Sequence, residues 1–141
     1  MFATTEQVII DRLREKLPDI TVEPLRELER VPELRQKAPA VFVIYDGYGV
    51  GEFVANGSIQ KITQDWYVVV AAKSAKGNGK ENTARDQAGE LCESVLSALL
   101  GFHLGGGRYL RLADAPGPEY DGGYCHVPLA FQSAATFKGQ P

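Results

Sequence analysis

Cysteine, long apolar runs and excess positive charge are all scarce in this chain. Its two cysteines in 141 residues, Cys92 and Cys125, are too few for a disulfide scaffold or a four-cysteine zinc site. The longest uninterrupted apolar run, residues 66–72, is far shorter than the roughly 20 residues that cross a bilayer. The net charge of −3 disfavours a strongly basic DNA-binding domain. We therefore expect no membrane partner and no sequence-specific nucleic acid, and we expect both cysteines to be reduced and buried.

The composition fits one globular domain. Hydrophobic residues make up 44% of the chain and charged residues 23%, which is ordinary for a folded protein. A length of 141 residues suits a single core, so we expect one domain over residues 1–141. The chain begins without a basic region followed by an apolar one, so we expect no secretory signal and a cytoplasmic location.

Two segments have the spacing of amphipathic helices. The first, residues 5–17, follows an N-cap at Thr4 and stops before Pro18. The second, residues 82–100, is the most regular pattern in the chain and ends before Gly101, where a helix-terminating glycine belongs. The apolar positions that form the two stripes are Val8, Ile9, Leu13 and Leu17 in the first and Ala84, Ala88, Leu91, Val95 and Leu99 in the second.

Three strands are predicted before the second helix. Residues 20–28 begin as a strand, followed by an irregular or one-turn segment, although Leu25, Leu28 and Leu34 also fit a short helix face. Residues 40–45 form a β-branched and aromatic run that is typical of a strand buried on both faces. Residues 58–73 alternate, with Ile62, Trp66, Val68 and Val70 on one face and Tyr67, Val69 and Ala71 on the other.

The chain between the second and third strands is rich in glycine. Residues 47–57 contain four glycines and end in Asn56-Gly57, a pair that favours a hairpin turn. We interpret this segment as a long, flexible hairpin arm, followed after the third strand by a loop at residues 74–80. The arm carries Tyr48, Val50 and Phe53, and apolar side chains on a protruding segment indicate a protein partner.

Two further strands are predicted after the second helix, at residues 108–114 and 123–137, with a turn at residues 105–107. In the last strand Pro128 indicates an edge or a bulge, because proline cannot donate to a sheet ladder. The predicted order is therefore α-β-β-β-α-β-β. It implies an α+β fold in which two helices pack on a mainly antiparallel sheet.

Each candidate catalytic or cofactor motif in the sequence lacks a required feature. The glycines of residues 47–51 do not open a helix, as a dinucleotide-binding turn must. The phosphate-loop pattern fails at residues 77–81, because Glu81 stands where Ser or Thr is required. Cys125 and His126 are adjacent on a strand and point to opposite faces, so they form neither a nucleophile–base pair nor a metal site. We expect no cofactor and no metal.

The arrangement as a whole resembles the tail terminator proteins of long-tailed phages, particularly the Mu-like family, with the minor tail protein U of lambdoid phages as a more distant relative. The resemblance covers about residues 4–137. It rests on the opening helix and on four segments: PAVFVIYDGYG, QKITQDWYVVVAA, RDQAGELCESVLSALLGF and PEYDGGYCHVPLAFQSAATF.

This resemblance implies a structural phage or prophage protein and not an enzyme. Its members cap the head-proximal end of the tail tube as a ring, usually a hexamer, which stops tube growth and prepares head joining. The implied partners are further copies of the chain, the tail tube protein and a head–tail connector protein, with assembly in the host cytoplasm and a final place in the virion tail. Another head–tail connector or tail-completion protein is the alternative, and a small ligand-binding domain or enzyme is a weaker one.

Two sets of residues are candidates for contact with these partners. Tyr48, Val50 and Phe53 lie on the arm, which we expect to contact a neighbouring subunit or the tube protein. Lys73, Lys76 and Lys80 make a locally basic loop in an acidic protein, which we expect to face an acidic partner surface or DNA that passes through the ring.

Overall fold

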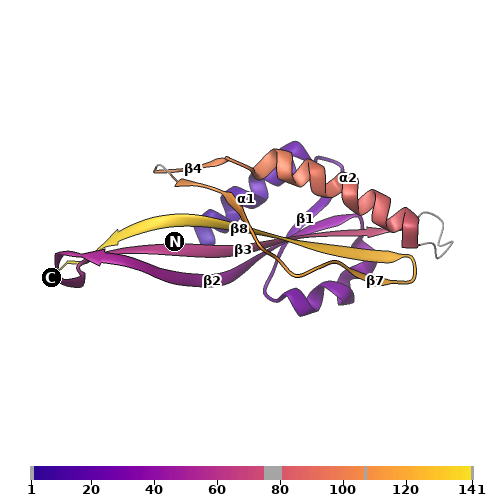
Figure 1. Cartoon of the computed structure of the whole chain (residues 1–141). Coiled ribbons are helices and arrows are strands. Elements are labelled where there is room, and N and C mark those ends of the chain that lie inside the picture. Colours follow the sequence, from indigo (N-terminus) through magenta and orange to yellow (C-terminus); the bar gives the residue numbers. More distant parts are fainter. Residues whose placement is uncertain (1, 75–80, 107, 141) are drawn as a thin grey trace.

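Three strands of 15 residues each, β2 (Ala40–Val54), β3 (Ile59–Lys73) and β8 (Tyr124–Lys138), form the spine of the computed structural model, which describes residues 2–74, 81–106 and 108–140 (Figure 1). The main sheet has the order β1-β2-β3-β8-β6, with β7 also paired to β8. The shorter strands of this sheet are β1 (Thr21–Leu25), β6 (Arg111–Ala113) and β7 (Glu119–Asp121). The α+β class is therefore confirmed.

Alternation along the long strands places apolar side chains on both faces at one end of the sheet. On one face, Val41, Val43, Trp66, Val68 and Phe131 belong to the main core beneath the helices. On the other face, Phe42, Ile44, Val69 and Ala71 belong to a second, smaller core. The predicted division of residues 58–73 between two faces and the double burial of residues 40–45 are both confirmed, because successive strand residues point to opposite sides.

Helices α1 (Phe2–Lys16) and α2 (Glu81–Leu99) cover the face of the main core. The end of α2 is as predicted, since Gly101 has a φ of +71°. The start of α1 is not, because the helix begins at Phe2 and Thr4 lies inside it instead of capping it. Thr5 and Ile10 join the buried side of α1, so tertiary packing extends the helix beyond the sequence signal.

A third helical element covers the opposite face of the sheet. The segment after β1 is η1 (Leu28–Lys37), a 3-10 helix whose Val31 is fully buried in the second core. Leu25, Leu28 and Leu34 pack against that core, so the apolar face noted in the sequence is used. The strand before it is shorter than predicted and runs parallel to β2, which makes the sheet mixed at this edge.

β8 has β3 on one side and only two short partners on the other, so the edge expected at Pro128 is confirmed locally, without a bulge. The strand pairs with β3 along its whole length without a register shift, and Pro128 lies opposite Val69. On its other side β8 pairs with β7 up to His126 and with β6 from Ala130. Pro128 therefore falls in the interval between these two short partners, where a missing N–H removes no ladder bond.

The chain between α2 and β8 is more divided than the sequence indicated. The predicted strand at residues 108–114 is interrupted at Leu110 and becomes β5 (Arg108–Tyr109) and β6. β5 pairs with β4 (His103–Gly105) in a separate two-stranded hairpin, and neither β4 nor β7 was predicted. The predicted order α-β-β-β-α-β-β is therefore incomplete, because two- and three-residue strands carry too little sequence pattern to detect.

Candidate partner interface

Beyond Tyr45 the strands β2, β3 and β8 run on together as a ribbon that projects past the helices (Figure 1). The arm predicted at residues 47–57 is part of this ribbon, and from here on we call the whole ribbon, residues 46–65 with 132–138, the arm. The turn η2 (Ala55–Gly57) closes it, and Ala55, Asn56 and Gly57 all have positive φ, as the Asn-Gly pair predicted. The arm is therefore three-stranded and not a simple hairpin, and its expected flexibility stays a prediction.

The register of the three strands gives the arm two distinct faces. Directly opposed residues in an antiparallel sheet share a face. Tyr48 lies opposite Gln64, Val50 opposite Ile62 and Phe53 opposite Gln60. On β8 the same rows continue to Ser133, Ala135 and Phe137. These rows are on the same side as the pair Trp66 and Phe131, so the arm extends the sheet face that forms the main core.

Ile62 and Ala135 on this face are buried, but the apolar side chains of β2 and of the end of β8 are largely uncovered. The exposed fractions are 61% for Tyr48, 72% for Val50, 65% for Phe53 and 41% for Phe137. Each lies on a face that, only a few residues away, is sealed by α1 and α2. An exposed apolar patch of this kind marks a contact surface for another macromolecule. The structure thus brings together the three arm residues selected from the sequence.

Sequence reasoning missed Phe137, which completes the apolar face from β8. The alternation of residues 123–137 did place Phe131, Ala135 and Phe137 on one side. What the sequence does not show is that β8 lies beside the arm, since that pairing joins residues 67 to 79 positions apart. The exposed apolar set on this face consists of Tyr48, Val50, Phe53 and Phe137.

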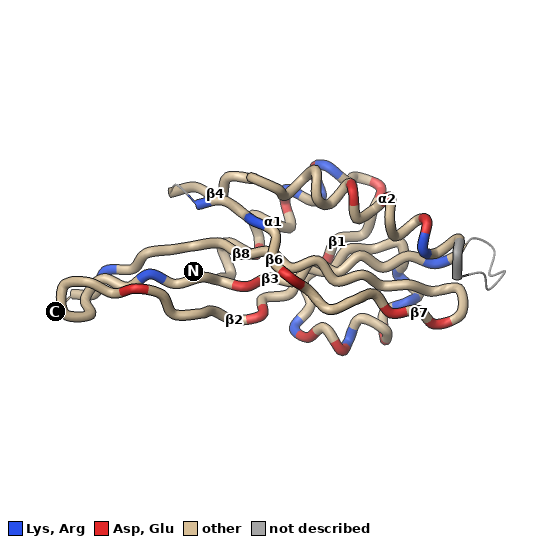
Figure 2. The backbone as a smooth tube through the Cα atoms, viewed as in Figure 1, with Lys and Arg blue, Asp and Glu red and all other residues tan. Residues whose placement is uncertain are grey.

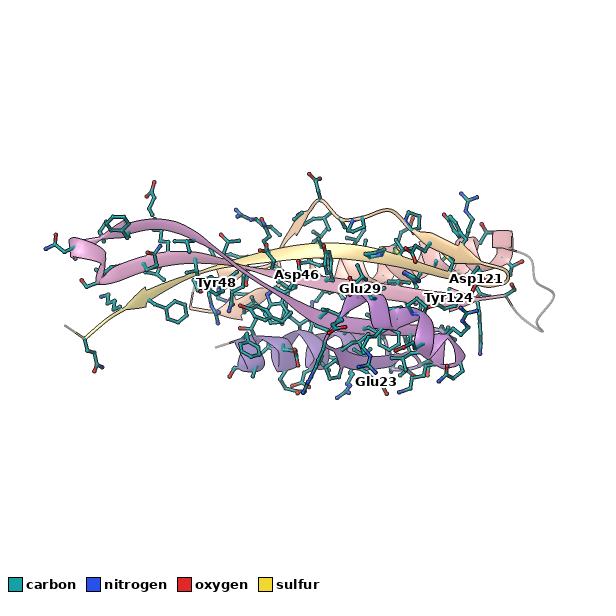
Figure 3. All side chains as sticks on the ribbon, turned by 90° about the horizontal axis from the view of Figure 1, so that it is seen from below. Glu23, Glu29, Asp46, Tyr48, Asp121 and Tyr124 are labelled. Atoms are coloured by element: carbon teal, nitrogen blue, oxygen red, sulfur yellow. The ribbon has the colours of Figure 1, made fainter. Side chains whose placement is uncertain are left out.

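The opposite face of the arm is more polar, and the arm as a whole carries few charges (Figure 2). Near its base the Gln132 amide donates a hydrogen bond of 2.9 Å to Asp65. Burial raises the pKa of Asp46, and the carboxylates of Asp65 and Glu29 raise it further. Tyr48 and Asp46 are labelled in Figure 3 near the start of the arm, with Glu29 beside Asp46. The two arm faces therefore differ in chemistry.

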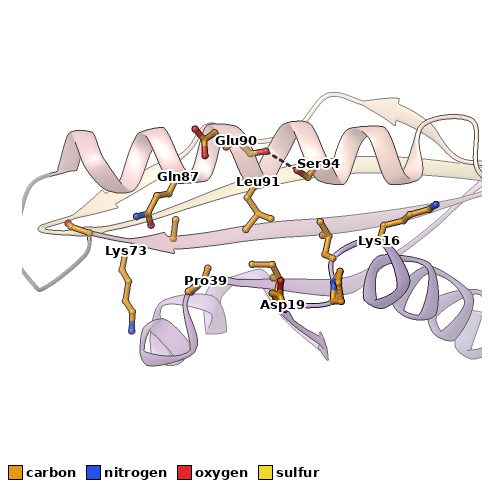
Figure 4. A pocket seen from close by; sticks show the side chains of 13 residues that line it. Lys16, Asp19, Pro39, Lys73, Gln87, Glu90, Leu91 and Ser94 are labelled. Carbon is orange, nitrogen blue, oxygen red and sulfur yellow. Dashed lines mark hydrogen bonds between the residues drawn. The ribbon is translucent and has the colours of Figure 1, made fainter.

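Lys73 lies at the other end of β3, so the structure does not bring it together with the arm residues. It is exposed, lies opposite Tyr124, and its side chain extends away from α2 (Figure 4). Lys76 and Lys80 lie outside the described residues, as does most of the predicted loop at residues 74–80. Lys73 and the arm residues Tyr48, Val50 and Phe53 thus lie at opposite ends of the molecule.

A groove of about 680 Å³ separates α2 from the end of α1 and the chain that follows it (Figure 4). Its apolar lining includes Leu17, Ile20 and Leu91, and Lys16 and Glu90 lie at its margin. In Figure 4 the Leu91 side chain points from α2 toward the sheet. The Ser94 hydroxyl donates to the carbonyl of Glu90 within the helix, so it is not directed at a ligand.

Cys125 and His126 lie on opposite faces of β8, as strand geometry requires. Cys125 belongs to the main core, whereas His126 faces η1 and lies 3.3 Å from the carboxylate of Glu119. Burial lowers the pKa of His126, and Glu119 opposes this in part. Cys92 is only half-buried, which corrects one expectation, and burial raises its thiol pKa to about 11. Such a thiol is a poor nucleophile at neutral pH.

The described residues contain neither a metal-binding group nor a membrane-spanning helix. Within residues 2–74, 81–106 and 108–140, no group of three or more His, Cys, Asp or Glu side chains is arranged to hold a metal ion. In the same part of the chain, no helix combines the length and the apolar character of a membrane span. The exposed apolar face of the arm is therefore the feature that best defines a site.

Comparison with known proteins points in one direction. A family model described as "Phage tail terminator protein" matches residues 1–141, the whole chain. A search of curated proteins finds no match. The family match agrees with the resemblance drawn from the sequence and covers both ends of the molecule, including the arm.

Proposed function

The chain belongs to the phage tail terminator family and is a structural component of the phage tail, and from this premise we propose that it ends growth of the tail tube. In this proposal several copies form a ring, which we take to be a hexamer, on the head-proximal end of the tube. The ring blocks addition of further tube subunits and presents a new surface for joining to the head.

The observation that carries the proposal is the uncovered apolar face of the arm. A monomer in water gains nothing from exposing Tyr48, Val50, Phe53 and Phe137 together, whereas a subunit interface or a contact with the tube buries them. At about 25 cal/mol for each Å² of apolar surface, burial of such side chains is a substantial driving force for association. The family match supports a role in the tail, and the exposed arm face supports a contact with a partner.

A ring also needs two different surfaces on each subunit. Closed rotational symmetry with more than two subunits requires heterologous contacts, in which one patch meets a different patch on the neighbour. The arm projects from one end of the molecule, while α2, β7 and Lys73 lie toward the other end (Figure 1). This polarity suits a head-to-tail arrangement. We also propose that Lys73, with Lys76 and Lys80, faces an acidic partner surface or the DNA path.

The test is a tube-growth assay. Tail tube protein polymerises alone, with the full chain, or with a variant that lacks residues 48–56, and tube lengths are measured by electron microscopy. The full chain should stop elongation and bind tube ends, and the deletion variant should keep the helical circular dichroism signal of α1 and α2 but lose both effects. Tubes of unchanged length with the full chain would contradict the proposed function.

The same assay separates a terminator from a head–tail connector or tail-completion protein. A terminator acts on tubes in the absence of heads, whereas a connector joins finished tails to heads without limiting tube length. Binding of the chain to heads, with no effect on tube growth, would favour the connector. The family match favours the terminator.

A further inference from the structure

The arm is open on both edges. β1 pairs with β2 only as far as Ile44, so no described strand pairs with the outer side of β2 from Tyr45 to Val54. At the other edge, β6 pairs with β8 only as far as Gln132, so residues 133–138 likewise have no described strand partner on their outer side. Open edges of this length present unpaired N–H and C=O groups that another strand can bind.

The hydrogen-bond pattern shows which groups of β8 face outward. At one end of the ladder the Gly139 N–H donates to the carbonyl of Ser58, and at the other end the Ser74 N–H donates to the carbonyl of Gly123. β3 and β8 pair between these points without a register shift, so the odd-numbered residues of β8 bond to β3. Even-numbered residues, including Ala134 and Thr136, therefore direct their N–H and C=O groups away from β3.

Short strands already bind the same side of β8 elsewhere. β7 pairs with even-numbered Tyr124 and His126, and β6 pairs with even-numbered Ala130 and Gln132 at the ends of its ladder. Residues 133–137 lack the devices that commonly block strand addition, because they contain no proline, no charge and no bulge. Beside this edge lies a groove of about 640 Å³, lined by β8 and by Thr4, Gly106 and Arg108. It leaves room for an extended segment.

The β2 edge of the arm has the features of a strand in a curved sheet. Its register shifts between Tyr45 and Gly47 and again between Val50 and Phe53, and bulges of this kind bend a strand. Gly47 has a φ of +103°, which favours glycine, and a Cβ at Gly51 would make a tight contact of 3.3 Å with the Lys61 carbonyl oxygen. Closure of strands from several subunits into one sheet requires such curvature.

We propose that β8 residues 133–138 of one subunit bind the β2 strand of a second copy, residues 47–54, as an added parallel strand. This inference rests on the proposed ring. β2 and β8 both run antiparallel to β3 and hence parallel to each other. For strands that run along the ring axis, rotation about that axis keeps both strand direction and face, so the pairing places Ala135 and Phe137 beside the neighbour's apolar row of Tyr48, Val50 and Phe53. The apolar face then continues from subunit to subunit.

The first test replaces the outward-facing backbone donor of Thr136. Thr136→Pro removes this N–H without removing a bond to β3, and Pro128 occupies an equivalent position in the same strand. Thr136→Ala changes the same side chain and keeps the N–H. Thr136→Ala should form rings, alone or on tail tubes, as the unaltered chain does. Thr136→Pro should stay monomeric, and normal ring assembly by Thr136→Pro would overturn the pairing while leaving the proposed function intact.

The second test uses the unaltered chain and does not depend on the folding of a proline variant. Amide hydrogen exchange at Ala134 and Thr136 should be fast in the monomer and slow by roughly a hundredfold in the assembled state, as new backbone bonds form. Exchange that stays fast at these two amides in assembled rings would overturn the proposal. If Ala134 and Thr136 stay protected on tubes in the variant without residues 48–56, the added strand comes from the tube protein. That result would overturn pairing with a second copy. A chain that never assembles would overturn the proposed function itself.

Discussion

Phe2 stacks on Tyr45, with ring centroids 4.7 Å apart and planes inclined by only 7°. Tyr45 in turn contacts Trp66, at 4.9 Å between ring centroids, so the start of α1 covers the apolar face of the sheet at this point. The next two apolar residues of β2 on that face, Tyr48 and Val50, are 61% and 72% exposed. On β2 the cover ends between Tyr45 and Tyr48, whereas Gln64 and Ser133, in the same row on β3 and β8, are still buried.

The uncovered face predicts a variant that folds but does not assemble. The double change Val50→Ser and Phe53→Ser removes apolar surface that no other part of the chain covers, so the free energy of unfolding should change by less than about 1 kcal/mol. Ring or tube binding, measured by light scattering, should weaken at least tenfold. Lys61→Ala, on the other face of the arm, is the control and should bind normally. Equal binding by the double variant and the control would contradict the assignment.

Phe131 and Phe137 provide a matched pair on one strand and one face. Phe131 is 1% exposed beneath the helices, and Phe137 is 41% exposed on the arm. Phe131→Ala should lower the free energy of unfolding by about 3–5 kcal/mol, because it leaves a core cavity. Phe137→Ala should cost less than about 1 kcal/mol in the monomer but weaken assembly. Urea denaturation measures the first effect, and similar losses of stability in both variants would show that the arm face is covered within the monomer.

The buried histidine predicts a pH dependence of stability. Burial lowers the pKa of His126 below the ordinary value of 6.5, so the unfolded chain binds this proton more readily than the folded chain. The free energy of unfolding should therefore fall as the pH drops through 6.5, and the loss should level off below the folded-state pKa. Urea titrations at pH 7.5 and 5.5 should show a smaller loss for His126→Gln than for the unaltered chain. Identical losses would mean that His126 does not titrate differently on folding.

Asp46, at the base of the arm, predicts a pH dependence of stability with the opposite sign. Desolvation and the neighbouring Asp65 and Glu29 raise the pKa of Asp46, so its charged form is disfavoured in the folded state. Asp46→Asn should raise Tm at pH 7, and the advantage should vanish below the ordinary pKa of 3.8, where Asp46 is protonated in both states. Glu52→Gln removes an exposed carboxylate from the same strand and should leave Tm unchanged. A gain that persists at pH 3 would point to a cause other than charge.

The elements that sequence predicted well are those with a long, local pattern. The stripe of α2, the apolar run of β2 and the alternation of β3 each depend on neighbouring residues. α2 and β3 were placed to within a few positions, and the start of β2 was placed correctly, but its end lies at Val54 and not at Tyr45. The turn at Asn56-Gly57 was found because its backbone demands positive φ. Phe2 and Thr4 were misjudged because a tertiary contact, the stacking on Tyr45, extends α1 past its local start signal.

The candidate site could be predicted only in part, because it also depends on tertiary contacts. Tyr48, Val50 and Phe53 were selected because they are apolar residues in a glycine-rich segment. Phe137 was not, because its place beside them depends on the pairing of β3 with β8. Pro128 correctly indicated an edge, but the sequence does not show that this edge is the interval between β7 and β6. Non-local strand pairing is what a single sequence specifies least directly.

The measurement that tests the central claim most directly is molar mass by light scattering, for the chain alone over a range of concentrations and with tail tube protein added. The account predicts a species near 92 kDa, six times the 15.4 kDa subunit, or a discrete complex at the ends of tubes that stops their growth. The variant without residues 48–56 should give neither. A full-length chain that stays at 15.4 kDa and ignores tail tube protein would contradict the account.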